Sequence, residues 1–447
     1  MDPTRLTVLT IKYLKEGKRS ALQTILEELH PFDFAELYRA LPEKHHYKFL
    51  TYLNPDQLAD LIGELEPESQ MEMLHKLGIE KSSKVMDIMD NDDLADMLGE
   101  LSVERLEEYL ASMKKEESNT VQQLMSYEPE TAGGIMTNEF VWIRDHYTVR
   151  DAVEKFKSFA ELTRNIYYLY VIDENKRLVG VVSYRDLLLA DTNEQISDIM
   201  FNRVISVPVN MDQEEVAQII QRYDFLACPV VDENNVLKGI VTVDDVIDVF
   251  IEEANEDIEK LSASGKDIDF NTKSYVAAYR RLPWLVLLLF IGLISGSILD
   301  GFEDTLNQVV ALIFFMPMIA GMTGNTGTQS LAVVVRGLVT NDLDKKTVMK
   351  LVFREFNVGI IIGITCGILV FLIATVWQDP MLGFVVGISL FTTLIIGTLA
   401  GTVIPLTLYK LGVDPAVASG PLITTINDIF SLLIYFGIAS ALLFYLI

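Results

Sequence analysis

Long uncharged apolar runs in the C-terminal half constrain this 447-residue chain most strongly. A helix of about 20 apolar residues crosses a bilayer. Five runs are candidates: Leu282–Leu299, Thr305–Val335, Phe356–Gln378, Pro380–Tyr409 and Pro415–Ile447, the last interrupted only by Asp428. The sequence therefore predicts a membrane domain over 281–447 with five helical spans. Two alternatives stay open, namely that one long run forms two short helices or that the first run lies partly in the interface.

The remaining residues are acidic and water-soluble in character. Residues 1–275 carry 28 Lys/Arg against 54 Asp/Glu, whereas the rest carries 8 against 9. Within the apolar half, every Lys/Arg lies before the first run, between the second and third, or between the fourth and fifth. Positive loops face the cytoplasm, and the N-terminus has no secretory h-region or cleavage site. We expect a multi-pass protein of the cell membrane, with cytoplasmic N-terminal domains, the C-terminus outside and no nucleic-acid partner.

Patterns typical of catalysis or thiolate chemistry do not occur in the sequence. Cys228 and Cys366 are isolated, so neither a disulfide framework nor a thiolate metal site is expected. No Ser-His-Asp, GxGxxG or GxxxxGK[ST] pattern is present. The sequence predicts a protein that is not an enzyme.

The first 130 residues have helical periodicity and weak self-similarity. The stretches AELYRAL at 35–41, ADLIGEL at 59–65 and ADMLGEL at 95–101 share a pattern of Leu/Met and acidic residues. Stacked helical hairpins would bury their apolar faces against one another. We therefore predict an acidic all-α domain over 1–130. Its acidic run DNDDLAD places Asp92 and Asp96 one turn apart on one helix face, where the ordinary interpretation is a solvated pair.

Residues 137–250 contain a clearer repeat with an offset of 59 residues. YVIDENKRLVGVVSYRDLLLA at 170–190 aligns with PVVDENNVLKGIVTVDDVIDV at 229–249. Both predict a strand, a DEN turn, a second strand and a helix. The pattern resembles tandem CBS domains, which are α/β modules, over 137–198 and 199–250.

That resemblance implies a nucleotide site. In CBS domains, a Ser/Thr-x-x-Asp after the second strand often binds an adenosyl ribose, and here it occurs as Ser183-x-x-Asp186 and Thr242-x-x-Asp245. Arg185 could meet a phosphate and Tyr168 could stack on a purine. ATP binding and a nucleotide-free pair both stay open.

An acidic helix, VDDVIDVFIEEANEDIEKL, follows at 243–261. Its carboxylates repel one another unless they are neutralised, and a hydrated Mg²⁺ would relieve this with one or two carboxylates as ligands. The alternative is a solubilising face beside the membrane. The negative inner leaflet argues against that alternative, because it usually attracts Lys/Arg.

In this order, the parts resemble the MgtE-type magnesium transporters essentially end to end. YEPETAGGIMT at 127–137 looks like that family's junction between helical and CBS domains, although Glu128-Pro129 departs from the usual Pro-Glu order. The resemblance implies a helical domain, a CBS pair, a connecting plug helix at 251–280 and five membrane helices. It also implies a homodimer in the lipid bilayer that takes up Mg²⁺ through a pore on the two-fold axis. Cytosolic Mg²⁺ bound to a sensor closes the pore in that family.

The resemblance assigns sensor carboxylates to the helical domain, the second CBS domain, the connecting segment and the loop before the fifth span. They are Asp92, Asp96, Asp212, Glu214, Asp224, Asp245, Asp248, Glu253, Glu256, Asp257 and Asp414. The register of Asp92 and Asp96 within the acidic run stays open.

The family's pore motif, Thr-Thr-x-x-Asp, corresponds to Thr424, Thr425, Asn427 and Asp428. Asn427 and Ser431 depart from the usual hydroxyl residue and glycine, and both keep the face hydrophilic. The second run adds Gly321, Gly324 and Gly327 at i+3 spacing, which permits close helix approach.

Asp428 lies about 13 residues into its run, roughly 20 Å along a helix. An ionised carboxylate is costly against lipid and usually faces a bundle interior or a water-filled path. Two such groups on a dimer axis would neutralise a hydrated Mg²⁺ without removing its waters. The alternatives are a carboxylate that only joins two helices, a transporter for another divalent cation such as Co²⁺ or Mn²⁺, and a CBS-based membrane sensor without conduction.

Overall fold

The computed structural model describes residues 3–65, 67–99, 101–159, 168–264, 268, 272–340 and 345–446. The chain forms two compact units, Met1–Ile251 and Glu252–Ile447. Helix α15 (Val243–Ser262) begins in the first unit and ends in the second. It coincides with the acidic helix predicted at 243–261.

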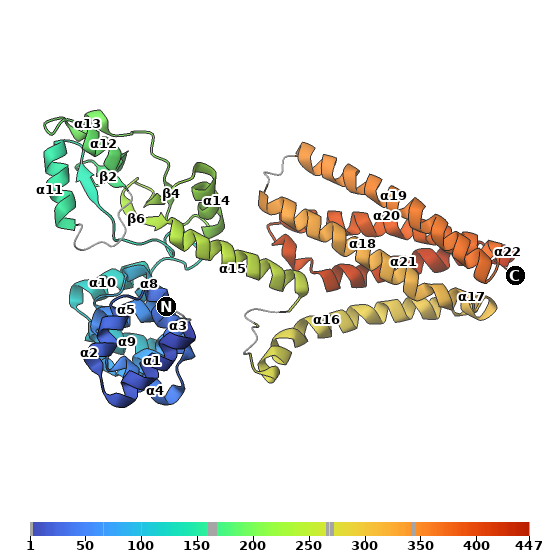
Figure 1. Ribbon diagram of the computed structural model, residues 1–447. Coiled ribbons are helices and arrows are strands. Elements are labelled where there is room, and N and C mark those ends of the chain that lie inside the picture. The colour runs from blue at the N-terminus through green and yellow to red at the C-terminus, as the bar shows by residue number, and fades with distance from the viewer. Residues whose placement is uncertain are drawn as a thin grey trace. The chain divides into compact units, whose positions relative to one another are not determined.

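The first unit begins with a bundle of short helices (Figure 1). They are α1 (Pro3–Glu16), α2 (Arg19–Leu26), α3 (Pro31–Ala40), α4 (Glu43–Leu50), α5 (Pro55–Gly63), α6 (Pro67–Leu77), α7 (Ile79–Met86), α8 (Asn91–Gly99), α9 (Val103–Ser112) and α10 (Lys115–Leu124). Local signals start several of them; the Asn54 side chain, for example, accepts a hydrogen bond from the Gln57 backbone to cap α5. The three self-similar stretches overlap α3, α5 and α8, and most of their Leu, Ala and Met residues are buried in one core, whereas Ala40 is exposed and Leu101 is half-buried.

Two three-stranded sheets follow, each with the same topology. The first contains β1 (Trp142–Arg144), β2 (Leu169–Ile172) and β3 (Leu178–Val182), with helices α11 (Val149–Phe159), α12 (Tyr184–Leu189) and α13 (Ile196–Ile199). The second contains β4 (Val207–Pro208), β5 (Ala227–Val231) and β6 (Leu237–Thr242), with α14 (Gln213–Tyr223) and α15. In both sheets the first pair is parallel and the second antiparallel. The predicted strand–turn–strand–helix order is confirmed in both copies.

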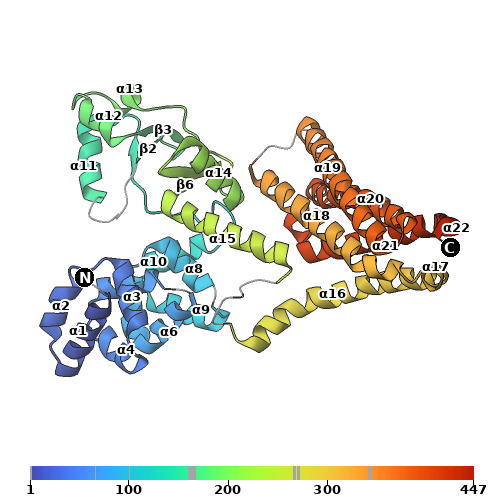
Figure 2. The ribbon, with the colours of Figure 1, turned by 45° about the vertical axis from the view of Figure 1, so that its right-hand side comes forward.

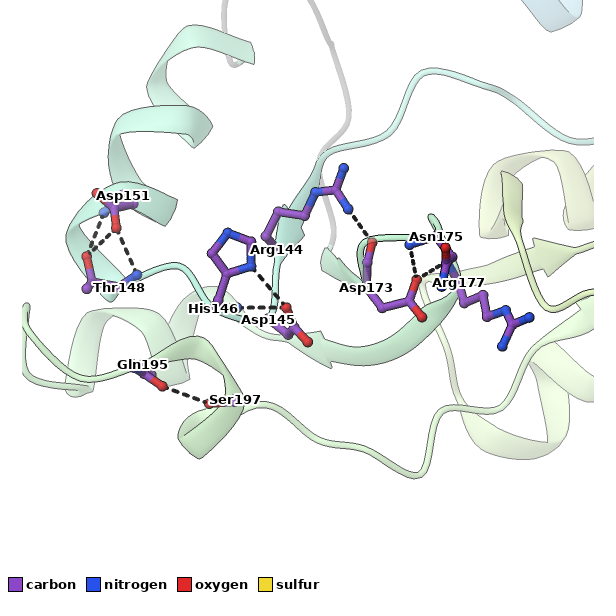
Figure 3. A network of polar contacts seen from close by, with 10 residues as sticks. All are labelled: Arg144, Asp145, His146, Thr148, Asp151, Asp173, Asn175, Arg177, Gln195 and Ser197. Atoms are coloured by element: carbon purple, nitrogen blue, oxygen red, sulfur yellow. Dashed lines mark hydrogen bonds and ion pairs between the residues drawn. The ribbon is translucent and has the colours of Figure 1, made fainter.

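The DEN turns are equivalent at the atomic level. The Asp173 carboxylate accepts from the Asn175 and Arg177 amides at 2.8 and 2.9 Å, and Arg144 donates to the Asp173 carbonyl (Figure 3). In the second copy, Asp232 accepts from the backbone two and four residues later, at 2.9 and 3.0 Å. Lys176 and Asn235 both have φ of 62°. The 59-residue offset therefore reflects a real structural repeat.

The second unit consists mainly of long helices. They are α16 (Ser274–Gly301), α17 (Glu303–Gln308), α18 (Leu312–Thr340), α19 (Lys345–Trp377), α20 (Pro380–Lys410), α21 (Gly420–Ala441) and α22 (Leu443–Leu446), with a 3₁₀ turn at Pro415–Val417. Figure 2 shows α18 to α21 side by side. The run Thr305–Val335 is not one helix, because α17 ends at Gln308 and α18 begins at Leu312.

Among the residues that the structure describes, four helices are long and apolar enough to cross a membrane: α16, α19, α20 and α21. The predicted count of five is not confirmed for the residues that the structure describes. Helix α18, with 29 residues, is long enough to cross a membrane. It is not among the four because its MTGNTGTQS segment lowers its mean hydropathy. A polar helix can still lie within a membrane bundle where neighbouring helices cover it, and α18 packs against α20 and α21.

Glycines set the close approach of these helices. A Cβ on Gly401 of α20 would lie 2.1 Å from the Gly327 carbonyl of α18, and one on Gly327 would lie 2.0 Å from the Asn427 amide of α21. A Cβ on Gly324 would meet the Thr424 side chain at 2.9 Å. The predicted close packing is thus confirmed for Gly324 and Gly327, whereas a Cβ on Gly321 would meet nothing within 4 Å.

Candidate functional site

Asp428 is the only charged residue of α21. Its side chain is partly buried, and no hydrogen bond or ion pair of its carboxylate is found among the described residues. Its backbone carbonyl accepts from Ser431 Oγ at 2.9 Å. In the described part of the chain no neighbouring helix holds this carboxylate, whereas a purely structural role would require such a partner.

The residues predicted to lie beside Asp428 in the pore motif differ in burial and in their hydrogen bonds. Thr424 and Thr425 donate to carbonyls one turn earlier in α21, at 2.9 and 2.8 Å, so their hydroxyl protons are engaged while the oxygens keep acceptor capacity. Asn427 is fully buried; its amide lies 3.4 Å from the Thr323 carbonyl. The Asn427 carbonyl oxygen has no partner in the described part of the chain. The Asn427 side chain thus packs from α21 against α18.

A second group of carboxylates forms within the first unit, where α8 meets the start of α15. One apolar cluster contains Leu94 and Leu98 of α8 together with Val246 and Val249 of α15. This packing brings Asp92 and Asp93 near Asp245, which we call the α8–α15 carboxylate cluster.

The electrostatics of the α8–α15 carboxylate cluster are unfavourable without a cation. Loss of water around the carboxyl groups, together with mutual repulsion, raises the pKa of Asp92 well above its usual range and that of Asp93 to about 7. Burial likewise raises the pKa of Asp245 to about 6, against the opposing hydrogen bond from Thr242. One oxygen of Asp92 is buried and has no hydrogen-bond partner among the described residues. Carboxylate oxygens of this kind are the ligands that Mg²⁺ prefers.

Asp96, like Asp93, is exposed on α8, and its charge helps to raise the pKa of Asp93. The sensor residues predicted in the second CBS domain lie at the two ends of α14. Asp212 caps the start of α14, where it accepts from the Glu214 amide at 2.9 Å, whereas Asp224 follows the end of this 11-residue helix. Eleven residues span roughly 16 Å, so one ion cannot contact both ends. No three His, Cys, Asp or Glu side chains close around a metal position in the described ranges.

The second unit contains a third charged group, at the end of α15. The Lys260 ammonium lies 2.6 Å from Asp414 Oδ2 and 2.8 Å from Glu256 Oε1. Burial would lower the pKa of Lys260, but the hydrogen bonds to these two carboxylates raise it. Burial and the charge of Asp414 raise the pKa of Asp257. The loop before α21 thus contacts the end of the acidic helix through Lys260, a residue that was not predicted to be functional. Glu253 lies two turns earlier on the same helix.

The nucleotide candidates lie in the first CBS domain. Ser183 donates to the Asp186 carboxylate at 2.6 Å and caps α12. Arg185 is exposed, while Tyr168 packs partly against Tyr170 and Leu178. In the second motif, Asp245 is part of the α8–α15 carboxylate cluster, whereas Asp186 of the first motif is exposed.

Three functional candidates were not predicted. Asp93 of α8 belongs to the cluster beside Asp92, and the charges of Asp245 and Asp96 help to raise its pKa. Lys260 is at i+4 from Glu256, a spacing that could have signalled the ion pair. Glu355 of α19 is buried and accepts from Ser330 Oγ of α18 at 3.1 Å; the predicted run began one residue later.

Three family models match the chain. The model described as a divalent cation transporter matches residues 316–438, the MgtE intracellular N domain matches 29–130, and the CBS domain matches 132–193 and 196–252.

Similar proteins cover the full length. The magnesium transporter MgtE of Bacillus subtilis (strain 168) is 59% identical over 442 residues, which cover 99% of this chain and 98% of the relative. The magnesium transporter MgtE of Thermus thermophilus is 40% identical over 98% of this chain and 99% of its own length. Among solved structures, the cytosolic domain of the Mg²⁺ channel MgtE in complex with ATP is 38% identical, with a TM-score of 0.52, and covers 54% of this chain and 99% of that one.

Proposed function

Because the chain belongs to the MgtE family of magnesium transporters, we propose that it conducts Mg²⁺ into the cell as a homodimer and is closed by cytosolic Mg²⁺. It is a transporter and not an enzyme. The N-terminal domains face the cytoplasm in this proposal, α18 is the fifth membrane helix and the C-terminus lies outside. We keep the domain boundaries predicted from the sequence, with one correction: the connecting helix predicted at 251–280 is not continuous, because α15 ends at Ser262 and α16 begins at Ser274.

The observation that carries the proposal is the carboxylate of Asp428, which no neighbouring helix binds among the described residues. A charge at this depth is tolerated where it faces water or a partner. In a homodimer, two Asp428 groups would face each other across the axis and attract a divalent cation. Mg²⁺ would pass with its waters hydrogen-bonded to the carboxylates and to acceptor oxygens of Thr424 and Thr425. Asn427, which packs against α18, would fix the orientation of α21.

Closure would involve the α8–α15 carboxylate cluster. The orphaned oxygen of Asp92 and the crowded carboxyl groups of Asp93 and Asp245 fit a hydrated divalent cation better than they fit an empty cluster. A cation there favours the packed arrangement of α8 on α15, because it removes the repulsion between the two helices. Asp248, Glu253, Glu256 and Asp257 extend the same acidic helix, whose end contacts Asp414. Asp96 adds its charge to this cluster beside Asp93, and the sensor residues predicted on α14, namely Asp212, Glu214 and Asp224, would bind cations separately.

ATP is proposed as a ligand of the first CBS domain. A relative's cytosolic domain was crystallised with ATP, and the Ser183–Asp186 motif is available for a ribose. Asp186 would accept from the ribose hydroxyls, Arg185 would pair with phosphate, and Tyr168 would contact the base.

Ion flux into liposomes tests the proposed function. We expect the purified full-length protein to admit Mg²⁺ down its gradient and to be inhibited when Mg²⁺ is added to the side of the soluble domains. Oxygen ligands do not separate Mg²⁺ from Mn²⁺ or Ca²⁺, so competition by Mn²⁺, Co²⁺ and Ca²⁺ distinguishes the alternative cargoes. Absence of flux for every ion would favour a non-conducting sensor.

A further inference from the structure

A cavity of about 270 Å³ lies between the end of α18 and the start of α19. Val333, Gly337 and Leu338 line it from α18, and Lys350, Leu351 and Arg354 line it from α19. The wall formed by α18 is therefore apolar, and the wall formed by α19 contains two basic side chains. Nothing in the transport path or in the carboxylate groups uses this cavity.

One of the two cations, Arg354, is held by an ion pair with the next residue. Arg354 donates from Nε and Nη2 to Glu355 Oε1, at 3.1 and 2.8 Å. The Glu355 carboxylate is buried against Ser330, whereas Arg354 is about half exposed. Glu355 thus holds the guanidinium of Arg354, and it is not itself among the residues that line the cavity. Lys350, one turn earlier, is exposed.

The cavity lies where the apolar part of α19 begins. The segment 336–355 carries five Lys/Arg and three Asp/Glu, and the residues that follow are uncharged as far as Gln378. In the proposed orientation, this is the level of the cytoplasmic phosphate groups. Basic pockets between membrane helices at that level bind anionic lipid headgroups.

We propose that the cavity binds one anionic phospholipid, with its phosphate between Lys350 and Arg354 and the first part of an acyl chain along Val333 and Leu338. A soluble phosphate would match the two cations but leave the apolar wall uncovered. A zwitterionic lipid would match the wall but not the net charge. The proposal rests on the proposed membrane location and adds a lipid ligand to it.

Native mass spectrometry of the full-length protein in detergent tests the proposal, with phosphatidylglycerol, phosphatidylcholine and glycerol phosphate as probes. We expect phosphatidylglycerol to be retained in preference to the other two. Lys350→Glu and Leu338→Trp, which remove the charge and fill the cavity, should each lower retention at least roughly five-fold, the effect of about 1 kcal/mol for one basic group near a headgroup. The matched control is Lys345→Glu, the same reversal on an exposed lysine of α19 outside the cavity, which should change retention less than two-fold.

Equal retention by the Lys350→Glu and Lys345→Glu variants would overturn the proposal. The proposal would also be overturned if phosphatidylcholine or glycerol phosphate bound as well as phosphatidylglycerol. It would be overturned as well if a second copy of the chain covered the cavity in a dimer and excluded lipid. These measurements need no Mg²⁺ gradient, so a negative lipid result does not contradict the proposed transport. Lipid retention can likewise be measured in a protein that does not transport.

Discussion

The Lys260 ammonium contacts Asp414 Oδ2 at 2.6 Å, joining the end of the acidic helix α15 to the loop before α21. The two residues are 154 positions apart in the chain. Lys260 also contacts Glu256, so one cation balances carboxylates from both segments. The contact therefore connects the end of α15 to the loop that precedes the helix carrying Asp428.

We predict that Lys260→Met weakens closure by cytosolic Mg²⁺. Without the ammonium, Glu256, Asp257 and Asp414 repel one another and the loop separates from α15. A coupling of about 1 kcal/mol would raise the inhibitory Mg²⁺ concentration roughly five-fold in a liposome flux assay. Lys273→Met, at an exposed lysine before α16, is the control and should leave inhibition unchanged. An unaltered inhibition curve for Lys260→Met would contradict the proposed coupling.

Asp245→Asn tests the α8–α15 carboxylate cluster. The amide oxygen can still accept from Thr242, so the variant removes charge while it preserves the local hydrogen bond. We expect the inhibitory Mg²⁺ concentration to rise about ten-fold, within the usual range of coupling free energies. Glu174→Gln, at an exposed turn of the first CBS domain, should have no effect. Unchanged inhibition by Mg²⁺ in the Asp245→Asn variant would contradict the proposal that this cluster is part of the Mg²⁺ sensor.

The pKa values of this cluster predict an unusual pH dependence. The folded-state pKa values of Asp93 and Asp245, about 7 and about 6, exceed the usual value for Asp. The folded state therefore binds more protons, and without divalent cations the free energy of unfolding falls as pH rises from about 4 to 7. Mg²⁺ binds the ionised groups, so its stabilising effect should instead grow over the same range.

The thiol of a native cysteine can be used to measure this pH dependence of the free energy of unfolding. Cys228 is buried in the first unit, so its labelling in a Cys366→Ala background reports opening of that unit. Samples would be equilibrated in urea at pH 5 to 8 and labelled briefly at one fixed pH. A urea midpoint that rises with pH in the absence of divalent cations would contradict the assignment of these carboxylates.

The CBS pair was predictable from sequence because its information is local and repeated. The two DEN turns, their Asp caps and the flanking strands recur at one offset, and both copies fold alike. The helical domain was predictable for the same reason, since each self-similar stretch coincides with one amphipathic helix.

The membrane half was less predictable because an uncharged run does not define where a helix breaks. Neither proline nor glycine marks the break between Gln308 and Leu312. Helix α19 begins at Lys345, eleven residues before the predicted run, because charged residues can form its first turns outside the apolar region. The pairing of Asp93 with Asp245 depends on tertiary packing, which periodicity alone does not specify.

Gly401→Ala tests the glycine-dependent packing of the bundle. The added methyl group would lie 2.1 Å from the Gly327 carbonyl, so α18 and α20 must separate. We expect overpacking to cost about 1–3 kcal/mol or more, seen as a lower melting temperature of the detergent-solubilised protein. Gly321→Ala, where a Cβ has free space, should be neutral or slightly stabilising. Equal melting temperatures for the two variants would contradict the packing described here.

Mg²⁺ flux through the Asp428→Asn variant tests the central claim most directly. Asparagine has nearly the same shape and removes the charge, and Asp300→Asn at the end of α16 is the matched control. The account predicts that the Asp428 variant folds, dimerises and loses Mg²⁺ uptake by at least ten-fold, about 1.4 kcal/mol, while the Asp300 variant transports normally. Uptake by Asp428→Asn equal to that of the unaltered protein would contradict it.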